Sequence, residues 1–373
     1  MKMKSKPLGL YVHIPFCKRK CNYCDFCSFA DKTSGDMEKY TDALVSEILS
    51  YKDSRLFLDT VFFGGGTPSL LSGECLCKIV FAIKEAFTLK PGYEFTVEAN
   101  PGTLDPEKLM LFKSLGVNRL SLGLQTSKEN EGKILGRIHS FGEFLENFRL
   151  AREFGFDNVN VDLMYAIPTQ TVKSLKETLE LVLSLSPEHI SAYSLILEEG
   201  TPLYKMQENL QFPNEDEESE MYFEITRRLK ESGYSHYEIS NYAKRGRESR
   251  HNLLYWQNGD YIGVGLSAHS YFQGRRFYNT DSLSDYLSSK GLQIEYERER
   301  DDAPYEYAML ALRTSFGLDN LEYKALFGVD FIETRKEKIK KYQELGFLTL
   351  SGQRLALTES GFYLSNSILV DLL

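Results

Sequence analysis

The stretch Leu8-Gly-Leu-Tyr-Val-His-Ile-Pro-Phe16, followed by Cys17-Lys-Arg-Lys-Cys21-Asn-Tyr-Cys24, decides the fold class of this chain. The first part is apolar and rich in strand-forming residues, which predicts a buried strand over Leu10–Phe16. The second part is a loop that carries three cysteines at spacings of three and then two residues. In α/β proteins the functional groups follow the carboxyl ends of strands, and the cysteine loop has this place after its strand.

Short strand-like runs alternate with longer helical patterns up to about residue 235. The expected strands are Leu10–Phe16, Thr60–Gly65, Glu94–Ala99, Arg119–Gln125, Asn158–Tyr165 and His189–Ile196. The expected helices lie near residues 37–52, 73–87, 105–115, 140–155, 171–185 and 215–232. Strict alternation of strands and helices predicts an α/β fold with a parallel sheet and right-handed crossovers. Periodicity does not choose between an open doubly wound sheet and a barrel-like arc.

The alternation ends near residue 235, which predicts three parts in the chain. Residues 1–235 form the α/β core, and residues 236–300 form a connecting region that wraps something instead of repeating the fold. Residues 301–373 begin with helices and end with two alternating runs that turn at Ser351-Gly352, a hairpin signal. This order resembles a small α+β winged-helix module.

The composition and charge of the chain disfavour nucleic-acid-binding, membrane and secreted proteins. The chain has 373 residues and a formal net charge of −9, which disfavours broad attraction to nucleic acid or anionic membranes. Residues 301–373 are also acidic, so we expect that part to pack or to contact a partner, not to bind nucleic acid. No apolar run reaches the roughly 18 residues of a membrane span, so an integral membrane protein is not expected. The basic start, Met1 to Pro7, leads into the first strand without a signal-peptide cleavage site, which predicts a cytoplasmic protein.

The six cysteines are distributed in a way that favours metal ligation over disulfides. Four lie within eleven residues, at positions 17, 21, 24 and 27. Thiolates at 17, 21 and 24 on one loop can bind three irons of a [4Fe–4S] cube and leave the fourth iron open. A structural zinc site would need a second pair of ligands, and no such pair has suitable spacing. Cys27 stays an alternative fourth ligand.

The C-x3-C-x2-C loop after a first strand resembles the signature of the radical S-adenosylmethionine (SAM) superfamily. This resemblance implies a partial (β/α)6 TIM-like barrel and a [4Fe–4S] cluster on Cys17, Cys21 and Cys24. It also implies that the open iron chelates the amino and carboxylate groups of SAM. The lead-in Tyr11-Val-His-Ile-Pro-Phe-Cys17 is similar to the oxygen-independent coproporphyrinogen oxidase group, and more specifically to its HemW-like branch. The oxidase proper has a further cysteine where this chain has Phe26.

The run Phe63-Gly-Gly-Gly-Thr67-Pro68 ends the second expected strand. Glycines there let the backbone approach a ligand closely, although a tight turn would need them too. The run lacks the spacing of a dinucleotide fingerprint and the Lys-Ser/Thr of a P-loop. Its resemblance to the GGGTP motif implies that Gly65, Gly66 and Thr67 bind the methionine amino group of SAM.

Polar residues near the ends of later strands match the order of the same family pattern. Taken one at a time, each of them could equally be a helix cap or a surface group. Glu98 suits a ribose diol, Gln125 offers an amide, and the Arg137 guanidinium suits a carboxylate. The resemblance assigns six further residues to the cofactor pocket: Tyr11, Tyr23, Glu98, Gln125, Arg137 and Asp162. For the two tyrosines, simple packing is the alternative interpretation.

The motif His251-Asn-Leu-Leu-Tyr255-Trp256 contains the only tryptophan of the chain. A histidine in this setting is by default a satisfied polar residue. Imidazole is also an axial ligand of haem iron, and flat rings pack against a macrocycle. The pattern H-N-x-x-Y-W is similar to that of HemW-like proteins, which implies haem binding through His251. His269 and His13 are second-choice ligands.

Two functions of different classes follow from these observations. The first is a haem chaperone that binds haem, a [4Fe–4S] cluster and SAM, and delivers haem to client proteins such as membrane respiratory enzymes. A homodimer is compatible with this interpretation, and no residue is assigned a catalytic role. The alternative is a radical enzyme that oxidatively decarboxylates the propionate side chains of coproporphyrinogen III. A generic iron–sulfur electron carrier would leave the glycine run unexplained.

Overall fold

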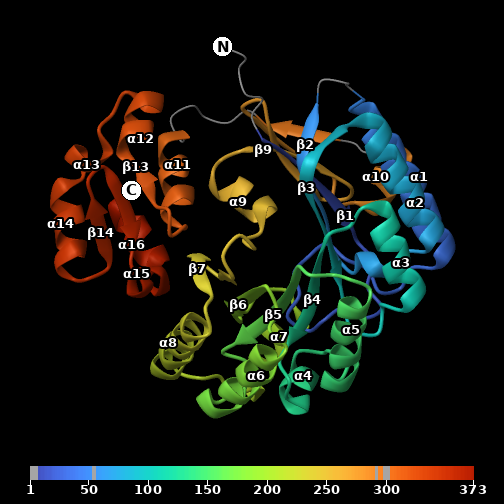
Figure 1. Ribbon diagram of the computed structural model, residues 1–373, viewed down its shortest axis with the longest axis horizontal. Coiled ribbons are helices and arrows are strands. Elements are labelled where there is room, and N and C mark those ends of the chain that lie inside the picture. Colours follow the sequence, from blue (N-terminus) through green and yellow to red (C-terminus); the bar gives the residue numbers. More distant parts are fainter. Residues whose placement is uncertain (1–6, 53–55, 290–292, 297–302) are drawn as a thin grey trace.

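A computed structural model describes residues 7–52, 56–289, 293–296 and 303–373 of the chain (Figure 1). Its main feature is a twelve-stranded sheet with the order β12-β11-β10-β9-β1-β2-β3-β4-β5-β6-β8-β7. The six central strands are β1 (Leu8–Ile14), β2 (Phe57–Gly65), β3 (Thr88–Ala99), β4 (Arg119–Gln125), β5 (Val159–Tyr165) and β6 (His189–Ser194). They pair in sequential order and in parallel, for example Leu10 with Val61 and Val97 with Leu120.

This sequential order settles the choice that periodicity left open. A doubly wound sheet reverses its strand order at a switch point, whereas a barrel arc adds each strand beside the previous one. The order β1 to β6 is therefore that of a partial (β/α)6 barrel, as predicted. Figure 1 shows the helices of this region along the outside of the curved sheet. They are α1 (Ser34–Ser50), α2 (Gly73–Ala86), α3 (Pro106–Leu115), α4 (Glu129–Ile134), α5 (Phe141–Glu153), α6 (Val172–Ser184), α7 (Pro202–Met206) and α8 (Glu215–Glu231), with 3-10 turns at Pro68–Leu70 and Gln207–Asn209.

The residues after the sixth core strand extend the sheet at both ends. Beyond β6 lie β8 (Asn241–Ala243) and β7 (Ser235–Glu238), both in antiparallel pairing. Beyond β1 lies β9 (Asp260–Val264) in parallel pairing, followed by the antiparallel strands β10 (His269–Phe272), β11 (Arg275–Asn279) and β12 (Gln293–Tyr296). The helix α10 (Leu283–Ser289) contacts α1. The short helix α9 (Arg250–Trp256) connects the two ends and contacts β1, β2 and β9.

The last part of the chain is a smaller unit of helices and one antiparallel sheet. Its three strands, β13 (Leu318–Asp319), β14 (Leu348–Ser351) and β15 (Arg354–Leu357), have the order β13-β15-β14. The predicted hairpin is confirmed, and Gly352 lies in its turn with a φ of 61°. The helices are α11 (Ala303–Leu312), α12 (Asn320–Phe327), α13 (Phe331–Thr334), α14 (Lys336–Glu344), α15 (Glu359–Tyr363) and α16 (Ser365–Leu372). The division of the chain near residues 235 and 300 stays a prediction.

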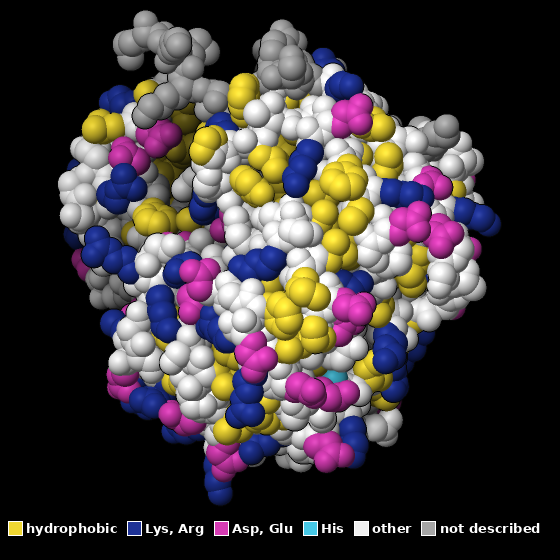
Figure 2. Space-filling view, turned by 45° about the vertical axis from the view of Figure 1, so that its right-hand side comes forward, with side chains coloured by type: hydrophobic (Ala, Val, Ile, Leu, Met, Phe, Trp, Pro, Cys, Tyr) yellow, Lys and Arg dark blue, Asp and Glu magenta, His cyan; other side chains and the backbone are white. Residues whose placement is uncertain are grey.

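The largest differences from the predicted elements have local causes. The strand β3 begins at Thr88, six residues earlier than expected, because Pro91 and Gly92 interrupt the apolar pattern. The helices α4 and α7 have six and five residues, which is too short for a helical period to be visible. Within the described ranges, no helix is both long and apolar enough to cross a membrane. Figure 2 shows acidic and basic side chains intermixed over one face of the molecule.

Candidate functional site

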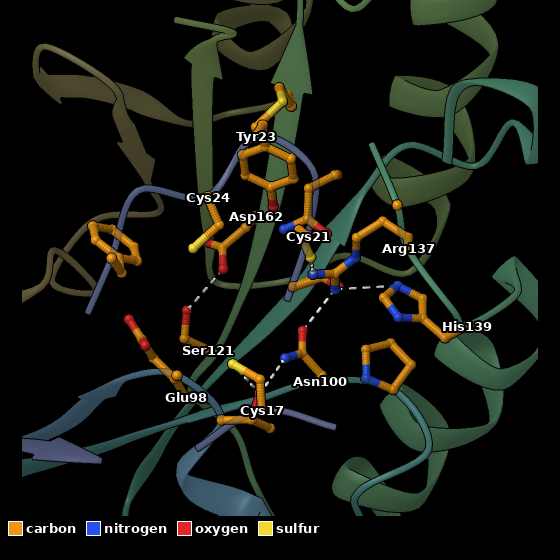
Figure 3. Close-up of a pocket in the computed structure, with 18 of the residues that line it drawn as sticks. Cys17, Cys21, Tyr23, Cys24, Glu98, Asn100, Ser121, Arg137, His139 and Asp162 are labelled. Atoms are coloured by element: carbon orange, nitrogen blue, oxygen red, sulfur yellow. Dashed lines mark hydrogen bonds between the residues drawn. The ribbon is translucent and has the colours of Figure 1, made fainter. Parts of the chain in front are cut away.

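A cavity of about 710 Å3 opens at the carboxyl ends of the barrel strands (Figure 3). It brings together eleven of the thirteen predicted site residues, which come from six different segments of the chain. These are Cys17, Cys21, Tyr23, Cys24, Gly65, Gly66, Thr67, Glu98, Gln125, Arg137 and Asp162. Parallel strands carry their carboxyl ends to one edge of a sheet, which explains why residues so far apart in sequence meet here.

The cysteine loop is held at the mouth of this cavity by backbone bonds at both of its ends. The amide of Cys17 donates to the carbonyl of Phe29 (2.9 Å), and the amide of Asn22 donates to the carbonyl of Leu135 (2.9 Å). The Asn22 side chain adds a bond to the carbonyl of Ile134 (2.9 Å). Within the loop, the amide of Cys24 donates to the carbonyl of Cys21 (3.3 Å), so contacts inside and outside the loop together set the positions of the three thiols.

All three predicted ligand cysteines are free thiols, and two of their sulfurs accept hydrogen bonds. Thr67 Oγ1 donates to Cys17 Sγ (3.8 Å), and Arg137 Nη1 donates to Cys21 Sγ (3.3 Å). Partial burial raises the pKa of the Cys17 and Cys24 thiols. In the part of the chain that the structure describes, no three His, Cys, Asp or Glu side chains converge as ligands of a single ion. Three thiols that each bind a different iron of a cube need not converge in this way, so the set fits a cluster.

Cys27 lies outside the lining of the cavity. Its sulfur is 4.0 Å from the carbonyl oxygen of Asp281, and its own carbonyl is hydrogen bonded to His13 Nε2 (2.8 Å). His13 is in turn bonded through Nδ1 to the Tyr11 hydroxyl (3.0 Å). Tyr11 also lies outside the cavity lining and stacks on Phe62. These contacts connect the strand β1 to the end of the cysteine loop.

The glycine run is required by the close packing of two strand ends beneath the cysteine loop. Gly65 has a φ of 107°, and a Cβ added there would lie 2.5 Å from the His13 ring. A Cβ at Gly66 would lie 2.6 Å from the carbonyl oxygen of Phe16. The amides of Gly66 and Thr67 donate to the carbonyls of Ile14 and Phe16 (2.8 and 2.7 Å). Any side chain at these two glycines would push the second strand away from the cysteine loop.

Two carboxyl groups face the interior of the barrel below the cysteines. Burial raises the pKa of Glu98 to about 8, with a further contribution from Asp162, against the opposing effects of the Gly65 amide and Arg119. The Gly65 amide donates to Glu98 Oε2 (3.2 Å). Burial likewise raises the pKa of Asp162, which accepts bonds from Asn160 (2.7 Å) and Ser121 (3.4 Å). Glu98 has one backbone donor and room for more, which suits the hydroxyl groups of a ligand.

Gln125 ends β4 with a φ of 68°, and its Oε1 is buried without a hydrogen-bond partner within the described residues. An unpartnered buried amide oxygen beside a cavity is a place for a ligand donor. Arg137 Nη2 donates to Asn100 Oδ1 and to the carbonyl of Gly123, both at 2.6 Å. Burial and the neighbouring Arg137 lower the pKa of His139 to about 4, so this histidine is neutral near pH 7.

Asn100 is a site residue that the sequence prediction missed. Its Nδ2 donates to Thr67 Oγ1 (2.8 Å), while its Oδ1 accepts from Arg137. One amide therefore links the glycine run to the arginine that contacts the cysteine loop. Its position two residues after Glu98, at the same strand end, was the available signal.

His251 lies outside the cavity and is 1% exposed. Its Nδ1 is bonded to Thr60 Oγ1 (2.8 Å), its Nε2 is bonded to the Tyr255 hydroxyl (2.7 Å), and its ring stacks on Phe62. Burial lowers its pKa to about 3, with a smaller effect of Arg119. The imidazole is thus neutral, and both of its nitrogens are used inside the protein.

Three other residues of the same motif, Asn252, Tyr255 and Trp256, line a second cavity of about 550 Å3. The remaining lining residues come from the turn between β7 and β8 and from the last part of the chain: Glu238, Ile239, Ser240, Asn241, Arg313, Ser365 and Asn366. Ser240 and Asn241 also line the first cavity. The two cavities are therefore neighbours, separated at this turn.

Comparison with known families agrees with this geometry. Residues 11–182 match the Radical SAM superfamily, and residues 299–364 match the HemN C-terminal domain. The structure is similar to that of coproporphyrinogen III oxidase (HemN) from Escherichia coli, with a TM-score of 0.85 and 23% identity over 98% of this chain and 90% of the other. The fold is that of a radical SAM protein, a class built around a [4Fe–4S] cluster and SAM.

Sequence relatives show to which family within this class the chain belongs. The chain is 37% identical over 370 residues to "Heme chaperone HemW" of Bacillus subtilis, covering 96% of this chain and 97% of the relative. It is 34% identical over 377 residues to the protein of the same name from Escherichia coli, covering 98% of both. The chain belongs to the HemW family.

Proposed function

We propose that this protein is a haem chaperone that binds haem and delivers it to client proteins. The observation that carries the proposal is the place of the H-N-x-x-Y-W motif, whose residues Asn252, Tyr255 and Trp256 line a cavity beside the cofactor pocket. A second support is the name "Heme chaperone HemW" of relatives that match over nearly the full length. We propose the cytoplasm as its location, since none of the six cysteines, all of which the structure describes, forms a disulfide.

The first cavity is proposed to hold a [4Fe–4S] cluster and SAM. Cys17, Cys21 and Cys24 supply the thiolates. The glycine run receives the methionine amino group through Gly65, Gly66 and Thr67. The chemistry that these cofactors supply when bound is one-electron reduction of a sulfonium.

The barrel residues of the cavity hold the rest of SAM in this proposal. Glu98 accepts from the ribose hydroxyls, and Arg137 pairs with the methionine carboxylate. Gln125 offers its unpartnered oxygen to a donor of the ligand. Tyr11, Tyr23 and Asp162 complete the pocket: Tyr23 and Asp162 line the cavity itself, and Tyr11 acts through His13.

His251 is the proposed axial ligand of haem iron. Nε2 of His251 is hydrogen bonded to the Tyr255 hydroxyl, so this hydrogen bond must break before Nε2 can bind iron. The neutral imidazole is already in the protonation state that binds iron. A homodimer and membrane respiratory enzymes as clients remain part of the proposal, and nucleic acid is not proposed as a partner.

The second candidate function is that of an oxygen-independent coproporphyrinogen III oxidase. The complete cofactor pocket favours it, as does the fold shared with HemN. Against it, Phe26 occupies the position of the further cysteine in the oxidase, and its side chain is 66% exposed.

The experiment that separates the two functions is anaerobic reconstitution followed by two assays on the same sample. A haem titration monitored in the Soret region should show saturable binding near one haem per chain. A turnover assay with coproporphyrinogen, SAM and a reductant should show little or no conversion. Rapid turnover of coproporphyrinogen without measurable haem binding would contradict the chaperone function and support the oxidase function.

A further inference from the structure

The second cavity contains a cation, Arg313, that has no anionic partner among the residues that the structure describes. Arg313 follows α11, is half-buried and donates from Nη2 to Asn366 Oδ1 (3.0 Å), a neutral amide oxygen. In the described part of the chain it takes part in no ion pair, whereas Arg354 of the same unit pairs with Asp319 (2.9 Å). Burial lowers the pKa of Arg313, so the guanidinium carries a desolvation cost that an anion would offset.

The position of Arg313 is fixed by the backbone. Its carbonyl accepts from the amide of Ile239 (3.2 Å), and the next residue, Thr314, forms a bridge with Glu238. The backbone of Arg313 is therefore held against the turn between β7 and β8, which separates the two cavities, and the guanidinium is held by its bond to Asn366. A side chain that already has one fixed contact loses less freedom when it binds a ligand.

The one carboxylate that lines this cavity is already satisfied by its neighbours. Glu238 is 1% exposed and accepts bonds from the side chain of Asn241 and from the amide of Ser240 (3.3 Å). Burial raises its pKa to about 7, so its negative charge is partly lost near neutral pH. Glu238 is thus bonded within its own turn and leaves Arg313 available to an external anion.

The second cavity combines two aromatic side chains, which can pack against a flat ring, with one cation, which can bind an acidic side chain of the same ligand. We propose that this cavity receives the carboxylate-bearing edge of a porphyrin and that Arg313 binds a propionate there. The inference rests on the proposed function and adds to it the residue that recognises the carboxylates. Trp256 and Tyr255 provide the aromatic wall, and an arginine suits a carboxylate because its N–H groups match the two oxygens.

The test compares three ligands on the reconstituted full-length protein: haem, iron-free protoporphyrin IX and haem with both propionates amidated. Arg313→Gln should weaken binding of haem and of iron-free porphyrin by about tenfold each, since a charge-assisted bond to the carboxylate is lost in both. Wild-type protein should bind the amidated haem about tenfold more weakly than haem, and Arg313→Gln should abolish this difference. Arg313→Lys should restore part of the loss.

Arg354→Gln is the matched control, because it removes an arginine of the same unit outside the cavity. It should leave the affinities for all three ligands unchanged. Arg313→Gln and Arg354→Gln should both keep the cluster iron content of wild type before haem is added. Equal affinities of wild type and Arg313→Gln for haem would overturn the inference while leaving the chaperone proposal in place. Equal affinity of wild type for haem and amidated haem would overturn it too, even if the variant failed to fold. Absence of any porphyrin binding by wild type would overturn both.

Discussion

The hydroxyl oxygen of Tyr255 and Nε2 of His251 lie 2.7 Å apart, and their hydrogen bond occupies the ring nitrogen that a metal would need. The other nitrogen is bonded to Thr60 on β2, which fixes the ring against the barrel wall. Both partners are parts of the interior, and Phe62 stacks on the imidazole. A haem ligated by His251 therefore competes with an internal hydrogen bond, and a reversible carrier benefits from such competition.

Tyr255→Phe should strengthen haem binding if His251 is the iron ligand. The substitution keeps the ring and removes the competing hydroxyl, so roughly 0.5–1.5 kcal/mol of opposing hydrogen-bond energy is lost. His251→Ala should remove most of the binding and change the Soret spectrum sharply. Titration of the two variants beside wild type checks this. If Tyr255→Phe loses affinity for haem, the hydroxyl supports haem binding and does not compete with it.

Cluster content should depend on three cysteines and not on the fourth. Replacing Cys17, Cys21 or Cys24 with Ala should remove most of the iron and the cluster absorbance, because each thiolate binds one vertex of the cube. Cys27→Ala is the matched control, since its sulfur lies outside the cavity and its loss should leave the cube largely intact. Iron and sulfide analysis after anaerobic reconstitution measures both. Equal iron loss in Cys27→Ala and Cys21→Ala would contradict the ligand assignment.

Glu98→Gln should make the cofactor-free protein more stable, and more so at pH 8 than at pH 5. The folded state holds the Glu98 proton up to about pH 8, whereas the unfolded chain releases it near pH 4.5. Between these values the native state binds more protons than the unfolded state, so the free energy of unfolding falls by about 1.4 kcal/mol for each pH unit gained. Glutamine removes this penalty. Thermal unfolding of wild type and variant at both pH values measures the gain in stability. A gain that is the same at pH 5 and pH 8, or no gain at either, would contradict the raised pKa of Glu98.

The same substitution should weaken SAM binding by about 1–3 kcal/mol, because a glutamine side chain in place of Glu98 has only one acceptor oxygen for the ribose diol. Calorimetry on the reconstituted variant measures the loss. Unchanged affinity would reject the ribose role of Glu98. A variant that is more stable without ligand yet binds SAM less well would show that the carboxylate is kept for the cofactor.

The strands and long helices of the barrel were predictable because their signals are local, whereas the barrel closure was implied by the family resemblance. Each core strand is a short apolar run bounded by turn residues, and each long helix shows apolar residues at three- and four-residue spacing, such as Tyr40, Leu44 and Ile48, all buried in α1. The cysteine spacing was informative for the same reason, since three predicted ligands on one loop are close in sequence and in space. The short helices α4 and α7 gave no period to detect.

The features of the candidate site that depend on tertiary contacts could not be predicted from the sequence. Nothing in the sequence near His251 indicates that Thr60, 191 residues away, occupies one of its nitrogens. Arg313 gave no signal either, because the absence of an acidic partner among the described residues is visible only once the last part of the chain is placed against the β7–β8 turn. Asn100 was closer to prediction, since it shares a strand end with Glu98.

The Arg137 guanidinium contacts four groups at once, one of which is His139 Nε2 (3.3 Å). It donates to Cys21 Sγ (3.3 Å), to Asn100 Oδ1 and to the carbonyl of Gly123 (both 2.6 Å). The ammonium of a lysine is a single point and does not span these acceptors. Arg137→Lys should therefore lower SAM affinity by about tenfold, because the carboxylate loses a positioned fork of donors.

Arg152→Lys is the matched control for this change. Arg152 forms a two-pronged ion pair with Glu188 (2.7 and 3.1 Å), and neither residue lines the cofactor pocket. Its replacement should cost stability without changing SAM affinity, so calorimetry and thermal unfolding on both variants separate binding from folding. If Arg137→Lys binds SAM as wild type does and shows only the stability loss of Arg152→Lys, the arginine holds the cysteine loop in place and does not bind the cofactor.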